Sequence, residues 1–226
     1  MKNQLRLFFC VFVIFFTTQA YGQKFGVRSG INLSSVGFGG GESELYANAA
    51  AMRSAATYGG YINLKIVPLL SLQLEGNYDP KGFVFDTPPV VDATFEGTYY
   101  QHYNYFTLPL LLKVNLLAFH VEAGPYLGLL MSAREVKKGT LRIPDLAGGY
   151  LEETYDEDTD LKPLTQKTDF GIAAGMGLTF NLGPAQLVLG ARYNHGLSNI
   201  LREPGEAFDK MTHRNFTIYG GAAIGF

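Results

Sequence analysis

Apolar and polar residues alternate along most of this chain, and Gly or Pro residues separate the alternating runs. Successive side chains of a β-strand point to opposite faces, so a period of two predicts strands. Helical periodicity is not evident in any stretch, which indicates an all-β fold. Eight strands are predicted, near residues 25–35, 56–67, 70–80, 101–115, 118–132, 167–181, 185–198 and 213–226.

The two faces of these predicted strands differ in composition. One face is apolar and carries no Asp, Glu, Lys or Arg in any strand centre, which suits a lipid-facing wall because a basic residue at the bilayer midplane costs about 2–4 kcal/mol. The other face is mostly Gly, Ala, Asn, Thr and Tyr. It lacks the many Lys and Glu of a solvated surface and suits the crowded interior of a small barrel. A soluble barrel or sandwich, whose apolar face would line its own core, is the less favoured alternative.

Short and long connections between the predicted strands alternate strictly. Three links are tight (VPLL, NLLA and NLGPA), whereas those near 36–55, 81–100, 133–166 and 199–212 are long. Outer-membrane barrels have this layout, and their even strand number leaves both termini in the periplasm. We therefore predict an eight-stranded antiparallel up-and-down transmembrane β-barrel. A β-bulge, expected first at Gly124–Pro125, would exchange the two faces beyond it.

The first 22 residues have the layout of a secretory signal peptide. Lys2 and Arg6 precede an uninterrupted apolar run, 7–16, and small residues stand at positions 20 and 22. Such a run is too short to span a bilayer as a helix, which needs about 20 residues. We predict a signal peptide over 1–22 and the barrel domain over 23–226. Removal of the signal also removes the only cysteine, which leaves no disulfide and no thiolate metal site.

Charge limits the partners of the exported chain. Loss of the two basic residues of the signal reduces the 18 basic residues to 16, against 20 acidic ones, for a net charge of −4. Nucleic-acid binding calls for a basic face and is not expected. The expected partners are outer-membrane lipid and lipopolysaccharide, and the barrel-assembly machinery during biogenesis. Phe226 ends the last predicted strand at the expected membrane interface, in the place of a girdle aromatic. We expect it to be the terminal residue that the assembly machinery engages.

Charged residues within the predicted strands fall on the inward face. Opposite charges in a narrow interior should pair, because an unpaired buried charge is very costly. We predict a structural charge network that plugs the lumen; a gated or narrow ion path is the alternative. The network comprises Arg28, Lys65, Glu75, Lys113, Glu122 and Arg192, with Asp169 nearer the outer end.

The third long connection carries a dense acidic segment. Its six carboxylates are Glu152, Glu153, Asp156, Glu157, Asp158 and Asp160. An EF-hand is excluded, because Leu161 and Lys167 stand where such a loop needs Gly and Glu. We predict a solvated acidic surface loop, with loose contact to divalent cations or a partner as the alternative. No metal site or cofactor is predicted.

Catalysis is not predicted either. The chain has four histidines but no G-x-S-x-G or H-E-x-x-H motif. His195 and Ser198 lie close together near the predicted outer rim and are the only weak candidates for a nucleophile and its base. We predict that the protein is not an enzyme; an outer-membrane enzyme that modifies lipid is the alternative.

Five stretches resemble the PorT-like, porin-family barrels common in Bacteroidota. They are GVRSGINLS (26–34), YFTLPLLLK (105–113), FHVEAGPYLGLL (119–130), DFGIAAGMGLTF (169–180) and RYNHGLSNI (192–200). The resemblance implies an eight-stranded outer-membrane barrel. The namesake of the family is associated with type IX secretion, so the resemblance also implies, as an alternative, a role as a component of a secretion or envelope complex.

Overall fold

The computed structural model describes nine strands and one short 3-10 turn. The described residues are 23–41, 47, 49–85, 94–144, 149–203 and 209–225, so the expected signal peptide and Phe226 lie outside them. The elements are β1 (Gln23–Gly39), β2 (Ala50–Val67), β3 (Leu70–Phe85), β4 (Thr94–Leu116), β5 (Phe119–Pro144), β6 (Tyr150–Asp160), η1 (Lys162–Leu164), β7 (Thr168–Leu182), β8 (Ala185–Gly196) and β9 (Lys210–Gly225). No helix in this part of the chain is long and apolar enough to cross a membrane.

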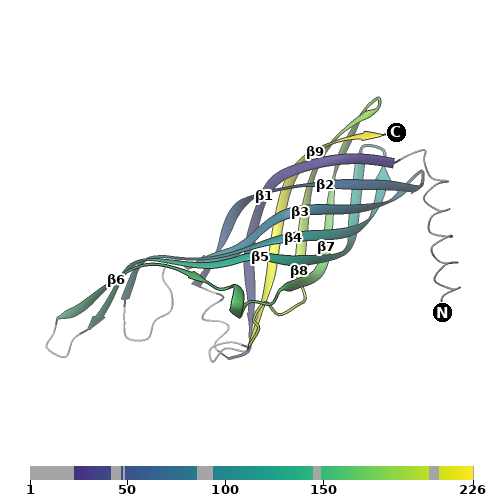
Figure 1. Ribbon diagram of the computed structural model, residues 1–226. Helices are drawn as coiled ribbons and strands as arrows, with labels where there is room; N and C mark the ends of the chain where they lie inside the picture. Colours follow the sequence, from purple (N-terminus) through teal and green to yellow (C-terminus); the bar gives the residue numbers. More distant parts are fainter. Residues whose placement is uncertain are drawn as a thin grey trace, which may run out of the picture.

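Eight of the nine strands close into a ring, which confirms the predicted fold (Figure 1). Around the ring the order is β1, β2, β3, β4, β5, β7, β8 and β9, and every neighbouring pair is antiparallel. The first and last strands pair from Lys24↔Gly225 to Gly39↔Lys210 and close the barrel. One end of the barrel carries the tight β2–β3, β4–β5 and β7–β8 turns, and we call it the short-turn end. The other is the long-connection end.

The barrel is apolar outside and polar inside, as β7 illustrates. Phe170, Ile172 and Met176 point outward and are more than half exposed, whereas Asp169 and Ala173 on the other face are buried. A soluble barrel would show the reverse arrangement, because its apolar face packs into its own core. The exposed apolar wall is the surface that a lipid environment would cover.

A β-bulge is present, but not where the sequence predicted it. The pairing of β5 with β7 runs without a shift through Gly124 and Pro125. Gly124 instead marks a close approach of β4, since a Cβ there would lie 2.0 Å from the carbonyl oxygen of Leu110. The extra residue is Met131, at the register shift between Asn104 and Tyr105 of β4. Beyond it the inward face of β5 changes from even to odd residue numbers.

The largest departure from the prediction is an arm that extends past the ring (Figure 1). The arm consists of residues 94–98 of β4, which continue beyond its pairing with β3, residues 134–144 of β5, and β6, which pairs with β5 alone. The sequence predicted a loop over 133–166. That prediction was wrong for most of the segment, which forms strands. Basic residues of β5 stand directly opposite acidic residues of β6, at Lys138↔Asp156 and Arg142↔Glu152. These cross-strand pairs favour a strand where the acidic segment alone would favour a solvated loop.

Candidate functional site

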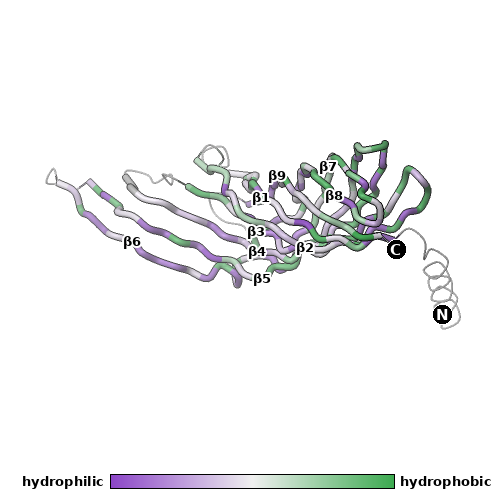
Figure 2. The backbone as a smooth tube through the Cα atoms, turned by 90° about the horizontal axis from the view of Figure 1, so that it is seen from above, coloured by the Kyte–Doolittle hydropathy of each residue, from purple (hydrophilic) through white to green (hydrophobic). Residues whose placement is uncertain are grey.

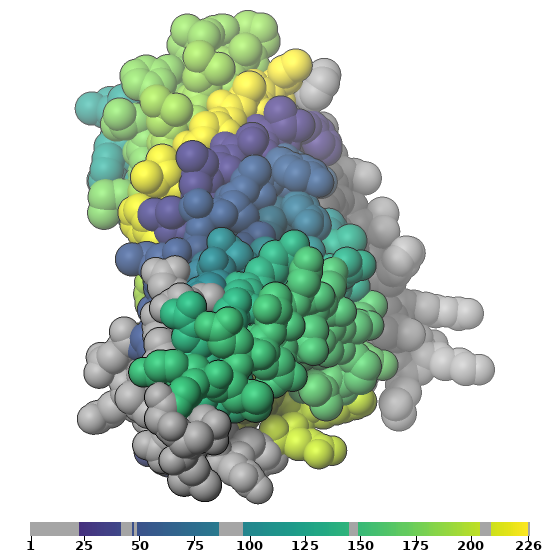
Figure 3. All heavy atoms as spheres, turned by 90° about the vertical axis from the view of Figure 1, so that its left-hand side faces the viewer, coloured from purple at the N-terminus to yellow at the C-terminus, as the bar shows by residue number. Residues whose placement is uncertain are grey.

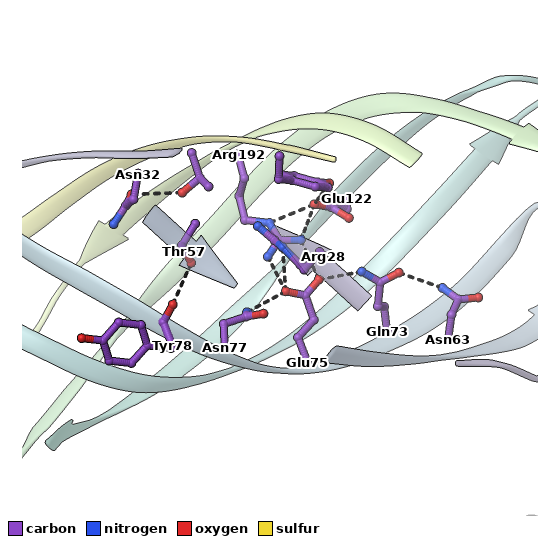
Figure 4. Close-up of polar contacts among 12 residues, drawn as sticks. Arg28, Asn32, Thr57, Asn63, Gln73, Glu75, Asn77, Tyr78, Glu122 and Arg192 are labelled. Atoms are coloured by element: carbon purple, nitrogen blue, oxygen red, sulfur yellow. Dashed lines mark hydrogen bonds and ion pairs between the residues drawn. The ribbon is translucent and has the colours of Figure 1, made fainter. Parts of the chain in front are cut away.

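The centre of the barrel holds a cluster of four buried, charged side chains (Figure 4). This central charge cluster consists of Arg28 on β1, Glu75 on β3, Glu122 on β5 and Arg192 on β8, each at most 7% exposed. Their strands are every second strand of the ring. The inward parity of four separate strands thus brings together two cations and two carboxylates that lie far apart in the sequence.

Arg192 reaches across the full width of the lumen. Its Nη1 and Nη2 lie 2.6 and 2.7 Å from the two carboxylate oxygens of Glu75, and its Nη2 and Nε lie 2.6 and 2.9 Å from Oε1 of Glu122. β3 and β8 are four steps apart in a ring of eight, so they are on opposite sides. Two-pronged pairs of this kind are among the strongest charge-assisted hydrogen bonds. The guanidinium cross-links the walls and obstructs the lumen.

Neutral groups complete the hydrogen bonding of Glu75. Gln73 donates to its Oε1 over 2.6 Å, and Asn77 donates to its Oε2 over 2.9 Å. Arg28 also pairs with Oε2 at 2.8 Å. Gln73 is in turn bonded to Asn63 of β2, which carries the polar network toward the short-turn end (Figure 4). A buried charge with this many partners is well compensated.

Tyr219 on β9 contacts both arginines and one carboxylate of the central charge cluster. Its hydroxyl donates to Oε1 of Glu122 over 2.9 Å, and the guanidinium carbon of Arg28 lies 3.9 Å from its ring centroid. Gly190 provides the space for this ring, because a Cβ at that position would lie 2.5 Å from Cζ of Tyr219. The small residues of the inward face therefore make room for large polar side chains on neighbouring strands.

Two of the six residues predicted for this network lie outside it. Lys65 has inward parity but is exposed at the rim of the short-turn end, and its predicted pairing was wrong: it forms no ion pair with any described residue. Lys113 is buried, at 5% exposure, and likewise forms no ion pair within the described chain. Lys113 stands opposite Glu122 in the β4–β5 register, but Glu122 is engaged by Arg192.

A second buried ion pair lies nearer the long-connection end. Nζ of Lys81 is 2.7 Å from Oδ2 of Asp169, and both side chains are at most 1% exposed. Ser198 and Tyr126 also donate to this carboxylate, over 2.7 and 3.3 Å. The sequence prediction missed Lys81 because it ended the third strand at residue 80. Continuing the inward parity of β3 by a few residues would have placed it in the lumen.

An apolar cluster closes the interior beyond this pair. Phe83 and Phe85 of β3 point inward and meet edge to face, with ring centroids 5.0 Å apart. Tyr103, Ile200 and Met211 belong to the same buried cluster and are each 2% exposed. The lumen thus contains, from the centre toward the long-connection end, a charge cluster, an ion pair and an apolar plug.

The six predicted carboxylates of the acidic segment all lie on β6 and are exposed. Three of them pair with β5: Asp158 with Arg134 at 3.2 Å, Asp156 with Lys138 at 3.3 Å, and Glu152 with Arg142 at 2.8 Å. Within the described residues no three His, Cys, Asp or Glu side chains are grouped so that they could hold a metal ion. Figure 2 shows the hydrophilic stretches that run along β6, and Figure 3 shows the arm in front when the molecule is viewed from that side.

His195 and Ser198 have different hydrogen-bond partners. Ser198 donates to Asp169 and accepts a hydrogen bond from the backbone N–H of Phe170 over 3.0 Å. The imidazole of His195 lies beside Tyr193 on the outward face, with Nδ1 3.5 Å from the hydroxyl. A nucleophile requires a base within hydrogen-bond reach, and these two side chains form no such pair.

Solved structures that resemble this chain are outer-membrane proteins. Ail, the attachment invasion locus protein of Yersinia pestis, is 13% identical, with 90% of this chain and 99% of Ail covered at a TM-score of 0.40. OprG of Pseudomonas aeruginosa is 15% identical (92% and 99% covered, TM-score 0.39). The outer membrane protease OmpT of Escherichia coli is 12% identical (92% and 97% covered, TM-score 0.48).

Comparison at the level of sequence gives a family but no individual relative. No curated protein sequence matches this chain. Residues 20–202 match the outer membrane protein beta-barrel domain. That span includes seven of the eight ring strands and the arm. The chain therefore belongs to the family of outer membrane protein β-barrel domains, and the protein is a β-barrel of the outer membrane.

Proposed function

We propose that this protein is a non-enzymatic outer-membrane barrel with a plugged lumen that acts through its arm, at the cell surface or as an accessory of an envelope complex. The short-turn end and both termini face the periplasm, and the arm emerges at the lipopolysaccharide surface. The outer wall contacts membrane lipid, and the barrel-assembly machinery inserts the exported chain. The strict alternation of short and long connections supports this orientation.

The arm is the observation that carries the proposal. β6 pairs with β5 along Arg134↔Asp160 to Pro144↔Tyr150, outside the ring. Strands that only needed to close the barrel could end at the ring, yet β4 and β5 continue as a hydrogen-bonded sheet. Long segments held out from a rigid scaffold are where binding residues are concentrated. The buried cluster within the lumen supports the same conclusion, because it leaves the outside of the barrel as the place for interaction.

A PorT-like component of type IX secretion is the more specific form of this proposal. The five stretches that resemble the PorT-like family lie in β1, β4, β5, β7 and β8, at positions that build the ring. They support kinship of the barrel itself. The arm contains none of the five stretches. A secretion role requires in addition that the arm contacts a large partner.

Shortening the arm tests the proposal. Residues 138–156 are replaced by Asn-Gly, a two-residue hairpin turn, between Lys137 and Glu157, which already face each other across β5 and β6. The ring pairs are untouched, so we expect the barrel to fold and to keep its band shift on unboiled gels. Cross-linking at the native locus followed by mild extraction is expected to recover a partner with the full-length chain and to lose it with the shortened one.

Arg202→Ala is the matched control, because Arg202 is exposed and lies outside the arm. It should recover the partner at the level of the unmodified chain. Equal recovery with the shortened arm would contradict the proposal. So would a full-length barrel that recovers no partner and whose arm can be shortened without any effect on the cell surface.

A further inference from the structure

A cavity of about 340 Å³ opens at the short-turn end of the barrel. Three lysines line it: Lys24 of β1, Lys65 of β2 and Lys113 of β4. Amide and hydroxyl side chains from five strands line the rest of its polar surface, and the described lining contains no Asp or Glu. The cavity therefore combines three positive charges with many neutral hydrogen-bonding groups and no counter-charge of its own.

Lys113 is the residue that distinguishes this cavity from an ordinary surface depression. Its side chain is buried, at 5% exposure, and it forms no hydrogen bond or ion pair with any described residue. A buried charge without a partner is strongly destabilising unless something compensates it. The hydroxyl of Tyr61, which lines the same cavity, is also buried and without a hydrogen-bond partner in the described chain. Both residues line this cavity, so it presents an ammonium and a hydroxyl that no described residue engages.

The neighbouring carboxylates are occupied elsewhere. Oε1 of Glu122 accepts from Arg192 and Tyr219, and Glu75 is held by Arg192 and Arg28. Gln73 separates the floor of the cavity from this cluster by donating to Glu75 (Figure 4). The two carboxylates of the central charge cluster are thus paired with its own arginines, whereas the three lysines of the cavity form no ion pair with any described residue. A concave, low-dielectric site lined by one sign of charge concentrates ions of the opposite sign.

We propose that this cavity binds a phosphate-class anion carrying two or more negative charges. Lysine ammonium groups bind phosphate as point charges, with Lys113 at the base and Lys24 and Lys65 at the rim. Side-chain amides, such as that of Asn63, and the Tyr61 hydroxyl supply further donors. The anion is either a soluble phosphorylated molecule on the short-turn side or the headgroup of an anionic phospholipid that folds over the rim. The proposal concerns the opposite end of the barrel from the arm and does not depend on what the arm contacts.

A bridging water is the alternative explanation for the unpaired ammonium of Lys113. Oε2 of Glu122 also has no hydrogen-bond partner among the described residues, and Glu122 is the register partner of Lys113. A water molecule between them would compensate both charges without any ligand. That arrangement requires no anion and gives no saturable anion binding.

Calorimetric titration of the full chain with pyrophosphate, in a non-ionic detergent, tests the proposal. Saturable binding that weakens with added salt is expected. Lys113→Met should reduce the affinity at least about tenfold, equivalent to about 1.4 kcal/mol. Lys65→Gln, at an exposed position that the fold does not need, should weaken binding several-fold. Lys210→Gln, exposed at the other end of the barrel, is the control and should leave it unchanged.

The same titration in nanodiscs distinguishes the two sources of the anion. Weaker pyrophosphate binding in phosphatidylglycerol discs than in phosphatidylcholine discs would identify a lipid headgroup as the occupant. Equal binding in both would identify a soluble anion. Absence of saturable binding to the unmodified chain would overturn the proposal, as would an affinity that neither Lys113→Met nor Lys65→Gln reduces.

Discussion

Arg192→Met is expected to lower the free energy of unfolding by about 3–5 kcal/mol, the usual cost of removing one partner from a buried ion pair. The substitution leaves Glu122 with the hydroxyl of Tyr219 alone, while Glu75 keeps Arg28, Gln73 and Asn77. It also removes a link between opposite walls of the barrel. The chain contains no Trp, so urea unfolding in lipid vesicles is followed by far-ultraviolet circular dichroism, with the band shift on unboiled gels as a second readout.

A second substitution that neutralises Glu122 separates the effect of the unpaired charge from the effect of the lost side-chain volume. Glu122→Gln in the Arg192→Met background should restore much of the lost stability, because the uncompensated charge, and not the missing guanidinium volume, is the main cost. Arg134→Met is the matched control: the Arg134–Asp158 pair is solvent-exposed, and exposed pairs contribute little. An Arg192→Met barrel as stable as the unmodified chain would contradict the cross-link.

Lys81→Met is expected to have the second largest effect, a loss of about 3 kcal/mol, for the same reason. It leaves Asp169 buried, with only the hydroxyls of Ser198 and Tyr126 to compensate its charge. Asp169→Asn alone leaves the ammonium of Lys81 without its carboxylate partner, between the rings of Tyr105 and Tyr126. The double substitution should cost less than the sum of the two single ones, with a coupling on the order of 1–3 kcal/mol in a double-mutant cycle.

Additive losses in that cycle would show that Lys81 and Asp169 act independently, which would contradict a direct ion pair. Lys162→Met serves as the control: Lys162 is exposed, and within the described chain its Nζ donates to the backbone carbonyl of Met131. It should unfold at the same urea concentration as the unmodified chain.

The ring of eight strands followed from the sequence because lipid contact imposes a strict period of two. In β7 every second residue is exposed to the surroundings of the barrel along the whole strand, and in β9 this alternation is broken only at Thr212 and Gly220. The same parity brought Arg28, Glu75, Glu122 and Arg192 to one place. Their distances, and the reach of Arg192 across the lumen, depend on the closure of the ring, which no local pattern encodes.

Three features escaped prediction for distinct physical reasons. The third predicted strand stopped near residue 80, whereas β3 continues to Phe85. Pro80 lacks an N–H donor and is tolerated within the strand because the β2–β3 pairing is interrupted there, between Tyr58↔Tyr78 and Met52↔Phe83. The bulge at Met131 carries no signal in residue type. β6 is acidic and resembles a solvated loop until its basic partner on β5 is known, so its structure comes from non-local pairing.

Closure of the lumen is the central claim, and conductance in planar lipid bilayers tests it most directly. The purified full chain is inserted at high salt, with folding verified by its band shift and an open porin measured alongside. Because the central charge cluster, the Lys81–Asp169 pair and the apolar plug fill the interior, we expect no sustained conductance. Stable, unitary conductance from the folded barrel would contradict the closed lumen and would favour a gated or narrow ion path through the charges.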